Sequence, residues 1–150
     1  PGKIYEYDIL TKEKKLVNLV ERYNLNKKIK FVPHCKEMPI AYSLSDVVVS
    51  ASIEPEAFGR ISVEAQSMGK PIIASNIGGS KETIINKKTG LLYKYDDPRE
   101  LAKNLNTVIQ LSVDELKSMG NEGRKNITKK FDVEIMCQSN LKEYKRLIKN

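Results

Sequence analysis

The sequence contains no tryptophan, one histidine and two cysteines among its 150 residues. Two distant cysteines, Cys35 and Cys137, do not make a disulfide framework, so we interpret them as reduced thiols. One histidine and two cysteines also lack a recognisable zinc spacing, which argues against a metal site. No apolar run approaches the roughly 18 residues that a membrane-spanning helix needs. Residues 1 to 10 lack the basic and apolar regions of a signal peptide.

Basic charge is in excess. Lys and Arg number 26 against 19 Asp and Glu, which gives a net charge of +7 and a pI near 9.3. Such a balance favours anionic partners, which include nucleotides, nucleic acids and acidic membrane surfaces, and it does not choose among them. The lysines are dispersed and no stretch interleaves aromatic with basic residues, so specific nucleic-acid binding is disfavoured.

Predicted helices and strands alternate along most of the chain. Helical patterns cover residues 12 to 23, 38 to 44, 61 to 68, 81 to 86 (capped by Ser80), 98 to 109 and 137 to 148, with another helix starting at the Ser112–Glu115 capping box. Short apolar runs predict four strands, over residues 29 to 32, 47 to 49, 71 to 75 and 91 to 93, and the run over 47 to 49 is entirely β-branched. This order predicts an α/β fold, with a Rossmann-like parallel sheet and helices on both faces.

The chain starts without methionine, and four strands are few for a doubly wound sheet. We therefore expect a fragment of a longer chain, truncated on its N-terminal side, in which residues 1 to 150 form one domain.

Polar residues are densest between Ser50 and Ser75. This segment leaves a strand, passes through a loop and enters a helix, and ligands of parallel sheets bind where the strands end. Gly59 allows a close backbone approach to a ligand. The amides of residues 59 to 62 are expected to be unpaired at the positive end of the helix dipole, which suits a diphosphate.

Two carboxylates bracket this helix start, Glu56 in the loop and Glu64 inside the helix. They need not touch each other, and each is able to accept hydrogen bonds from a pair of sugar hydroxyls. Gly78 and Gly79 form a second loop after the next strand, and we expect this loop to line the same cleft.

Glu56 and Glu64, with seven residues between them, resemble the E-x7-E motif of family 4 retaining glycosyltransferases, which have the GT-B fold. The resemblance spans roughly residues 16 to 148. Further motifs at the family's spacing are Phe58-Gly59, Gly69-Lys70-Pro71-Ile72-Ile73-Ala74, Gly78-Gly79 with Glu82, and Thr89-Gly90-Leu91-Leu92.

The resemblance implies a role for each site residue. Glu56 is implied to bind the donor sugar and support catalysis, and Glu64 to bind the ribose. The implied donor-binding residues are Glu56, Phe58, Gly59, Arg60, Ile61, Ser62, Glu64, Gly78 and Gly79. Arg60 is left open between the donor and a surface ion pair, and Phe58 is favoured as a packing residue over a base-stacking one.

The resemblance also implies what the whole protein does. The chain resembles the C-terminal, nucleotide-sugar-binding domain of a bacterial, metal-independent, retaining hexosyl- or glycosyltransferase without a cofactor. The resemblance implies an N-terminal acceptor domain upstream of this chain, so we expect little transferase activity from this chain alone. Implied acceptors are glycans or lipid-linked molecules, and the implied location is the cytoplasm, with contact to the inner face of the membrane left open. The alternative is a basic α/β module that binds a nucleotide or nucleic acid without catalysis.

Overall fold

The computed structural model describes residues 14 to 32 and 34 to 148. Contacts divide the chain into residues 1 to 36 and residues 37 to 150, and each unit is described by itself. In the first unit, residues 14 to 22 are helical, in agreement with the prediction, although part of the predicted helix lies outside the described residues. The strand predicted over residues 29 to 32 is wrong, because this segment pairs with no other in the part of the chain that the structure describes.

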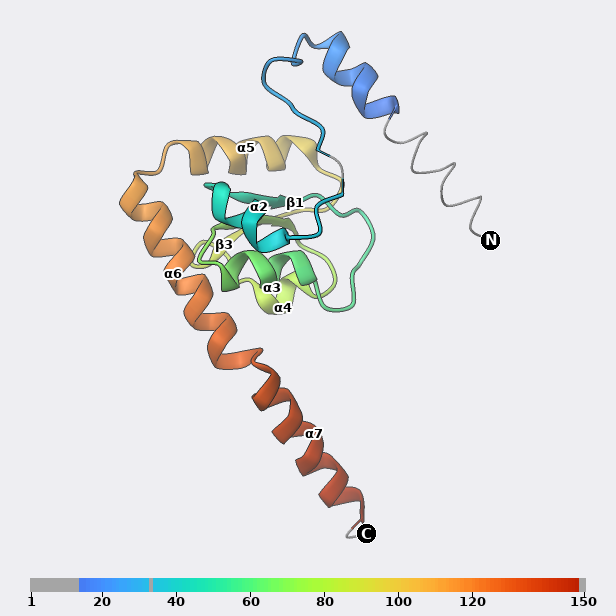
Figure 1. Ribbon diagram of the computed structural model, residues 1–150, viewed down its shortest axis with the longest axis vertical. Coiled ribbons are helices and arrows are strands. Elements are labelled where there is room, and N and C mark those ends of the chain that lie inside the picture. Colours follow the sequence, from blue (N-terminus) through green and yellow to red (C-terminus); the bar gives the residue numbers. More distant parts are fainter. Residues whose placement is uncertain (1–13, 33, 149–150) are drawn as a thin grey trace. The chain divides into compact units, whose positions relative to one another are not determined.

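The second unit contains a parallel sheet of three strands in the order β1-β2-β3 (Figure 1). These are β1 (Val48–Ser50), β2 (Ile72–Ser75) and β3 (Gly90–Tyr93). The register pairs Val48 with Ile72, and Ile72 with Gly90. Three of the four predicted strands are confirmed, each within one residue of its expected start.

Helices cover both faces of the sheet, as the sequence predicts. They are α2 (Met38–Leu44), α3 (Arg60–Ser67), α4 (Ser80–Thr83), α5 (Pro98–Ile109), α6 (Val113–Lys130) and α7 (Val133–Ile148). Figure 1 shows α5 on one side of the sheet and α3 with α4 on the other. Alternate residues of β2 supply the two cores: Ile72 and Ala74 pack on the side of Ala65, and Ile73 packs on the side of Val108.

Capping residues explain where several helices begin. The Asp97 carboxylate accepts from the amides of Arg99 and Glu100 at the start of α5. The capping box of Ser112 and Glu115 is present at the start of α6, as predicted. The helix predicted over residues 81 to 86 ends instead at Thr83, and Gly79 rather than Ser80 occupies its N-cap. It ends early because Ile84 is extended and Asn86 forms a bridge with Gly90.

Helix α6 packs closely against the turn after α3 because it carries glycine there. A β-carbon at Gly120 would overlap the carbonyl group of Gly69. A β-carbon at Gly123 would lie 3.1 Å from Cγ of Gln66, which is tighter than an ordinary contact. Two glycines three residues apart therefore let the two helices approach each other.

Two asparagine side chains form hydrogen bonds with the backbone on the outer edge of β3. The Leu92 amide donates to Oδ1 of Asn86 at 2.9 Å. The Leu92 carbonyl accepts from Nδ2 of Asn104 at 3.2 Å. Side chains thus occupy the positions that a neighbouring strand would use.

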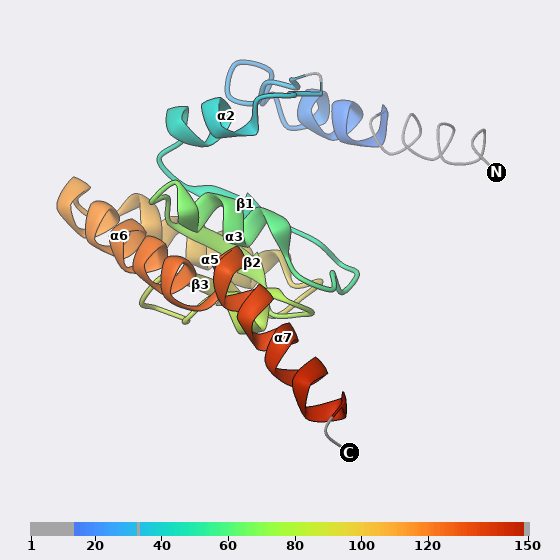
Figure 2. The same cartoon turned by 60° about the horizontal axis from the view of Figure 1, so that its bottom comes forward.

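Helix α7 follows α6 after a break at Phe131 and Asp132 (Figure 2). None of its residues is buried, and the apolar side chains of Leu141 and Tyr144 are 52% and 63% exposed. Within the described ranges, no helix combines the length and the apolar character needed to cross a bilayer.

Candidate functional site

Serine hydroxyls connect the end of β2 to the loop that carries Glu56. Ser75 is 2% exposed, and its Oγ donates to the Ser52 carbonyl at 2.7 Å. Oγ of Ser52 in turn donates to Oε1 of Glu56 at 2.8 Å. The sheet therefore holds the carboxylate that the sequence marked as catalytic. Sequence reasoning missed Ser52 and Ser75, although a serine at or just beyond a parallel strand end was an available signal.

The loop of Gly78 and Gly79 contacts the same segment. The Gly79 amide donates to the Glu56 carbonyl at 2.8 Å. Gly78 has φ +52°, and a β-carbon there would lie 2.7 Å from the Glu56 nitrogen. A β-carbon at Gly79 would overlap the Phe58 backbone. Both glycines are required for this close approach, and the two loops lie side by side as expected.

The start of α3 presents backbone donors. Gly59 is the N-cap in a left-handed conformation, φ +72° and ψ 55°. In the described part of the chain, no backbone acceptor pairs with the amides of Gly59, Arg60 and Ile61. The Ser62 amide, however, donates to the Gly59 carbonyl at 3.0 Å, and its hydroxyl is buried 3.3 Å from that of Ser80. The expectation of an unpaired amide is therefore wrong for Ser62, because the first turn closes on Gly59.

Two side chains hold the Glu64 carboxylate. Oε2 accepts from the Tyr42 hydroxyl at 3.0 Å, and Oε1 accepts from Nη2 of Arg60 at 3.1 Å. The Arg60 side chain is 82% exposed and that of Glu64 is 34% exposed, so water reaches the ion pair between them. Tyr42, by contrast, is only 5% exposed. The buried hydroxyl is thus the more rigid of the two partners.

Tyr42 remains a hydrogen-bond donor at ordinary pH. Burial, followed by the hydrogen bond to Glu64, raises the pKa of Tyr42 to about 12. Helix α2, which carries Tyr42, is anchored by Nζ of Lys70, which donates to the carbonyls of Ser43 and Ser45 at 2.9 and 2.8 Å. Sequence reasoning did not place Tyr42 in the site, because Tyr42 precedes the motif and lies 22 residues from Glu64.

The remaining predicted residues border the two loops. Phe58 is 47% exposed and meets Phe131 edge to face, with the ring centroids 6.0 Å apart. This contact supports the packing role that the sequence favours. Ile61 is 37% exposed beside the open start of α3. Glu54 and Glu56 are both exposed, and of these two carboxylates only that of Glu56 accepts a hydrogen bond from a side chain within the described residues.

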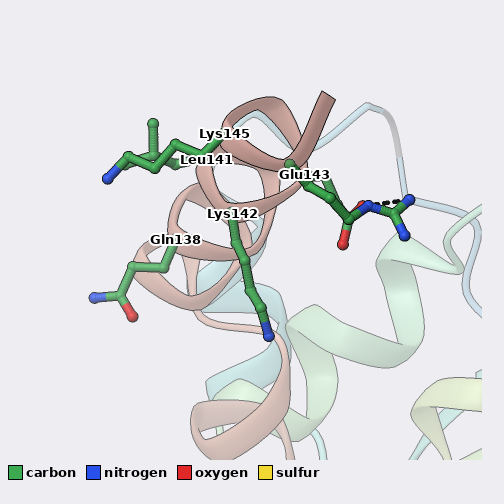
Figure 3. A pocket seen from close by; sticks show the side chains of 6 residues that line it. Gln138, Leu141, Lys142, Glu143 and Lys145 are labelled. Atoms are coloured by element: carbon green, nitrogen blue, oxygen red, sulfur yellow. Dashed lines mark ion pairs between the residues drawn. The ribbon is translucent and has the colours of Figure 1, made fainter. Parts of the chain in front are cut away.

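A hollow of about 460 Å³ lies elsewhere, on the side of α7. Its lining residues all belong to this one helix: Gln138, Leu141, Lys142, Glu143, Lys145 and Arg146. Figure 3 shows the labelled side chains pointing in different directions. Glu143 and Arg146 form an ion pair of 2.9 Å. Exposed side chains on a single helix do not build a fixed site, so the hollow is not a candidate.

Metal ligands do not gather in the described residues, where no group of three His, Cys, Asp or Glu side chains could hold an ion. Metal-independent binding of a diphosphate remains a prediction. The donors that the structure does offer to an anion are the free amides at the start of α3 and the guanidinium of Arg60.

Residues 9–126 match the model of the family "Glycosyl transferases group 1". The chain belongs to this family. Spore coat protein SA of Bacillus subtilis is 30% identical over 112 residues, which are 74% of this chain and 29% of that protein. The match to the family thus covers most of this chain, whereas the chain covers less than a third of this relative's length.

Solved structures agree with the fold. A glycosyltransferase from Rickettsia africae superposes with a TM-score of 0.85 at 34% identity, over 92% of this chain and 37% of that one. Anabaena Alr3699/HepE in complex with UDP-glucose gives a TM-score of 0.80 at 28% identity, over 89% of this chain and 36% of that one. The structural neighbours are GT-B glycosyltransferases, and the predicted fold class is confirmed.

Proposed function

We propose that this chain is the nucleotide-sugar-binding domain of a retaining, family 4 glycosyltransferase. Its membership of the group 1 family supports glycosyl transfer, and one structural relative is described with UDP-glucose. The observation that carries the proposal is the contact between the two loops, in which Gly79 bonds the Glu56 backbone beside the free amides of α3. This contact supports the proposal, because it ties the loop of Glu56 to the Gly78–Gly79 loop and the free amides that follow are suited to bind an anion.

Each group then acts on a different part of the donor. The amides of Gly59, Arg60 and Ile61 bind the diphosphate, and the helix dipole adds favourable electrostatics without a metal. Glu64 binds the ribose hydroxyls. A carboxylate oxygen has two acceptor positions, so Glu64 receives ribose while it keeps its bond to Tyr42. Glu56 binds the sugar hydroxyls and supports transfer from the donor.

The rest of the enzyme is proposed from the same resemblance. The chain is the C-terminal domain, and an N-terminal domain of the same protein binds a glycan or a lipid-linked acceptor. Reaction takes place in the cytoplasm or at the inner face of a membrane, where the net charge of +7 favours contact with anionic lipids. The protein is proposed to be bacterial and to use no cofactor beyond the donor.

The first test is calorimetric titration of the full-length protein with UDP, GDP and ADP. We expect one of them to bind, and Glu64→Ala to weaken it about tenfold or more, because a hydrogen-bonded charged acceptor is lost. Glu54→Ala is the matched control, since it removes an exposed carboxylate from the loop before α3, and this variant should bind like wild type. The proposal fails if no nucleotide binds, or if Glu64→Ala binds unchanged.

Binding of DNA or RNA to the full-length protein tests the alternative function. A basic module for nucleic acid would bind DNA or RNA with an affinity that falls steeply as salt rises. Such binding, in the absence of nucleotide binding, would favour that alternative.

A further inference from the structure

A buried amide on α3 has no part in the site described so far. Gln66 is 0% exposed. Its Nε2 donates to the carbonyls of Ser62 and Thr83, both at 3.0 Å. Its Oε1 is buried and finds no hydrogen-bond partner among the described residues.

The two carbonyls belong to the helices that follow the two loops. Ser62 closes the first turn of α3, whose opening amides are free. Thr83 ends α4, which begins directly after Gly79. One side chain therefore links the segments on which the diphosphate site depends. Nδ2 of Asn126 from α6 also donates to the Thr83 carbonyl at 3.0 Å, so this point is held from two sides.

Stability alone does not explain a glutamine at this position. An unpaired buried oxygen is unfavourable, and an apolar side chain of similar volume would avoid it. A methionine fills the same space, and such swaps of matched volume are well tolerated in cores. What methionine cannot do is donate to both carbonyls.

We propose that Gln66 is a positioning residue that fixes the spacing between the start of α3 and the Gly78–Gly79 loop. This inference rests on the proposed function, because the segments that Gln66 positions are those proposed to bind the donor diphosphate. Gln66 does not touch the donor. It acts through the carbonyls of Ser62 and Thr83, so its loss changes recognition of phosphates more than recognition of the nucleoside.

The test uses Gln66→Met in the full-length protein, with the nucleoside diphosphate that wild type binds and the matching nucleoside without phosphates. We expect diphosphate affinity to fall about tenfold, which corresponds to the loss of well-placed charge-assisted bonds, and nucleoside affinity to change little. Thr89→Val is the matched control. Thr89 is 1% exposed and its Oγ1 accepts from the Ile85 amide at 2.9 Å, in a turn beyond α4, so its replacement should leave diphosphate affinity unchanged.

Unchanged diphosphate affinity in folded Gln66→Met would overturn the proposal, as would equal losses for diphosphate and nucleoside. If Gln66→Met does not fold, the test uses Asn126→Ala instead, because Asn126 is the other side-chain donor to the Thr83 carbonyl. About threefold weaker diphosphate binding is then expected, as for one neutral hydrogen bond, and unchanged binding overturns the proposal. Failure of wild type to bind any nucleoside diphosphate overturns the proposed function itself, whereas the outcomes in Gln66→Met leave that function standing.

Discussion

The Tyr42 hydroxyl gives the Glu64 carboxylate a fixed direction. Arg60 bonds the other oxygen of Glu64, but its exposed side chain is free to leave when a ligand arrives. Tyr42 is buried and its pKa is raised to about 12, so its hydroxyl still donates to Glu64 at working pH. We infer that ribose binding depends on this bond although Tyr42 need not contact the ribose.

Replacing Tyr42 with phenylalanine keeps the buried ring and removes only the hydroxyl. We expect the affinity for the nucleoside diphosphate to fall about three- to tenfold, as when a carboxylate loses a hydrogen bond. The 2′-deoxy analogue should lose less, because it offers Glu64 only one ribose hydroxyl. Calorimetry with both ligands measures the difference, and Tyr95→Phe, at an exposed tyrosine, is the control. Equal losses for the two ligands would contradict the role of Tyr42.

Sequence reasoning proposed those residues of the candidate site whose spacing is local. Glu56 and Glu64 lie in one continuous segment. Gly78 and Gly79, which bring the loops together, are recognisable as an adjacent pair of glycines after a predicted strand. Tyr42 and Gln66 were not predicted, because their partners lie 22 and 17 residues away and become neighbours only after folding. Residue identity alone does not distinguish a buried glutamine from a surface one.

At the scale of elements, the contact between α6 and the turn after α3 depends on Gly120. Gly120→Ala places a methyl group against the Gly69 carbonyl, a backbone atom that cannot rotate away. We expect a loss of about 1–3 kcal/mol in the free energy of unfolding, typical of overpacking, measured by urea denaturation.

Gly69→Ala is the informative comparison. A β-carbon there meets nothing within 4 Å, but φ is +68°. The expected cost is about 1–2 kcal/mol from backbone strain alone, and Gly69→Asn should recover part of it because asparagine tolerates this conformation. A Gly120→Ala variant as stable as wild type would contradict the packing argument.

Most elements were predictable because their signals are local. Buried strands showed short apolar runs, and the α6 capping box is a four-residue pattern. The failures have physical causes: residues 29 to 32 have the composition of a strand but no pairing partner among the described residues. Helix α4 stops after one turn because the chain becomes extended at Ile84 before β3.

At the scale of the whole molecule, the chain spans 29% to 37% of the relatives compared above. Transfer of a sugar requires an acceptor beside the donor, and the proposed acceptor site lies in another domain. We therefore expect the 150-residue chain to transfer sugar at a rate far below that of the full-length protein. The rate of sugar transfer is measured for both proteins with a radiolabelled donor and a mixture of cell-derived acceptors. Circular dichroism checks that the 150-residue chain is folded. A comparable rate from the 150 residues would contradict the division of roles.

The asparagines on β3 have a consequence for how the sheet can grow. Asn86 and Asn104 already bond the outward amide and carbonyl of Leu92. A strand from another molecule therefore cannot pair with these two backbone groups. β1 has a neighbour on one side only in the part of the chain that the structure describes. Within the described residues, the sheet is therefore open to a further strand beside β1, while two asparagine side chains cover the backbone of Leu92 on the β3 side.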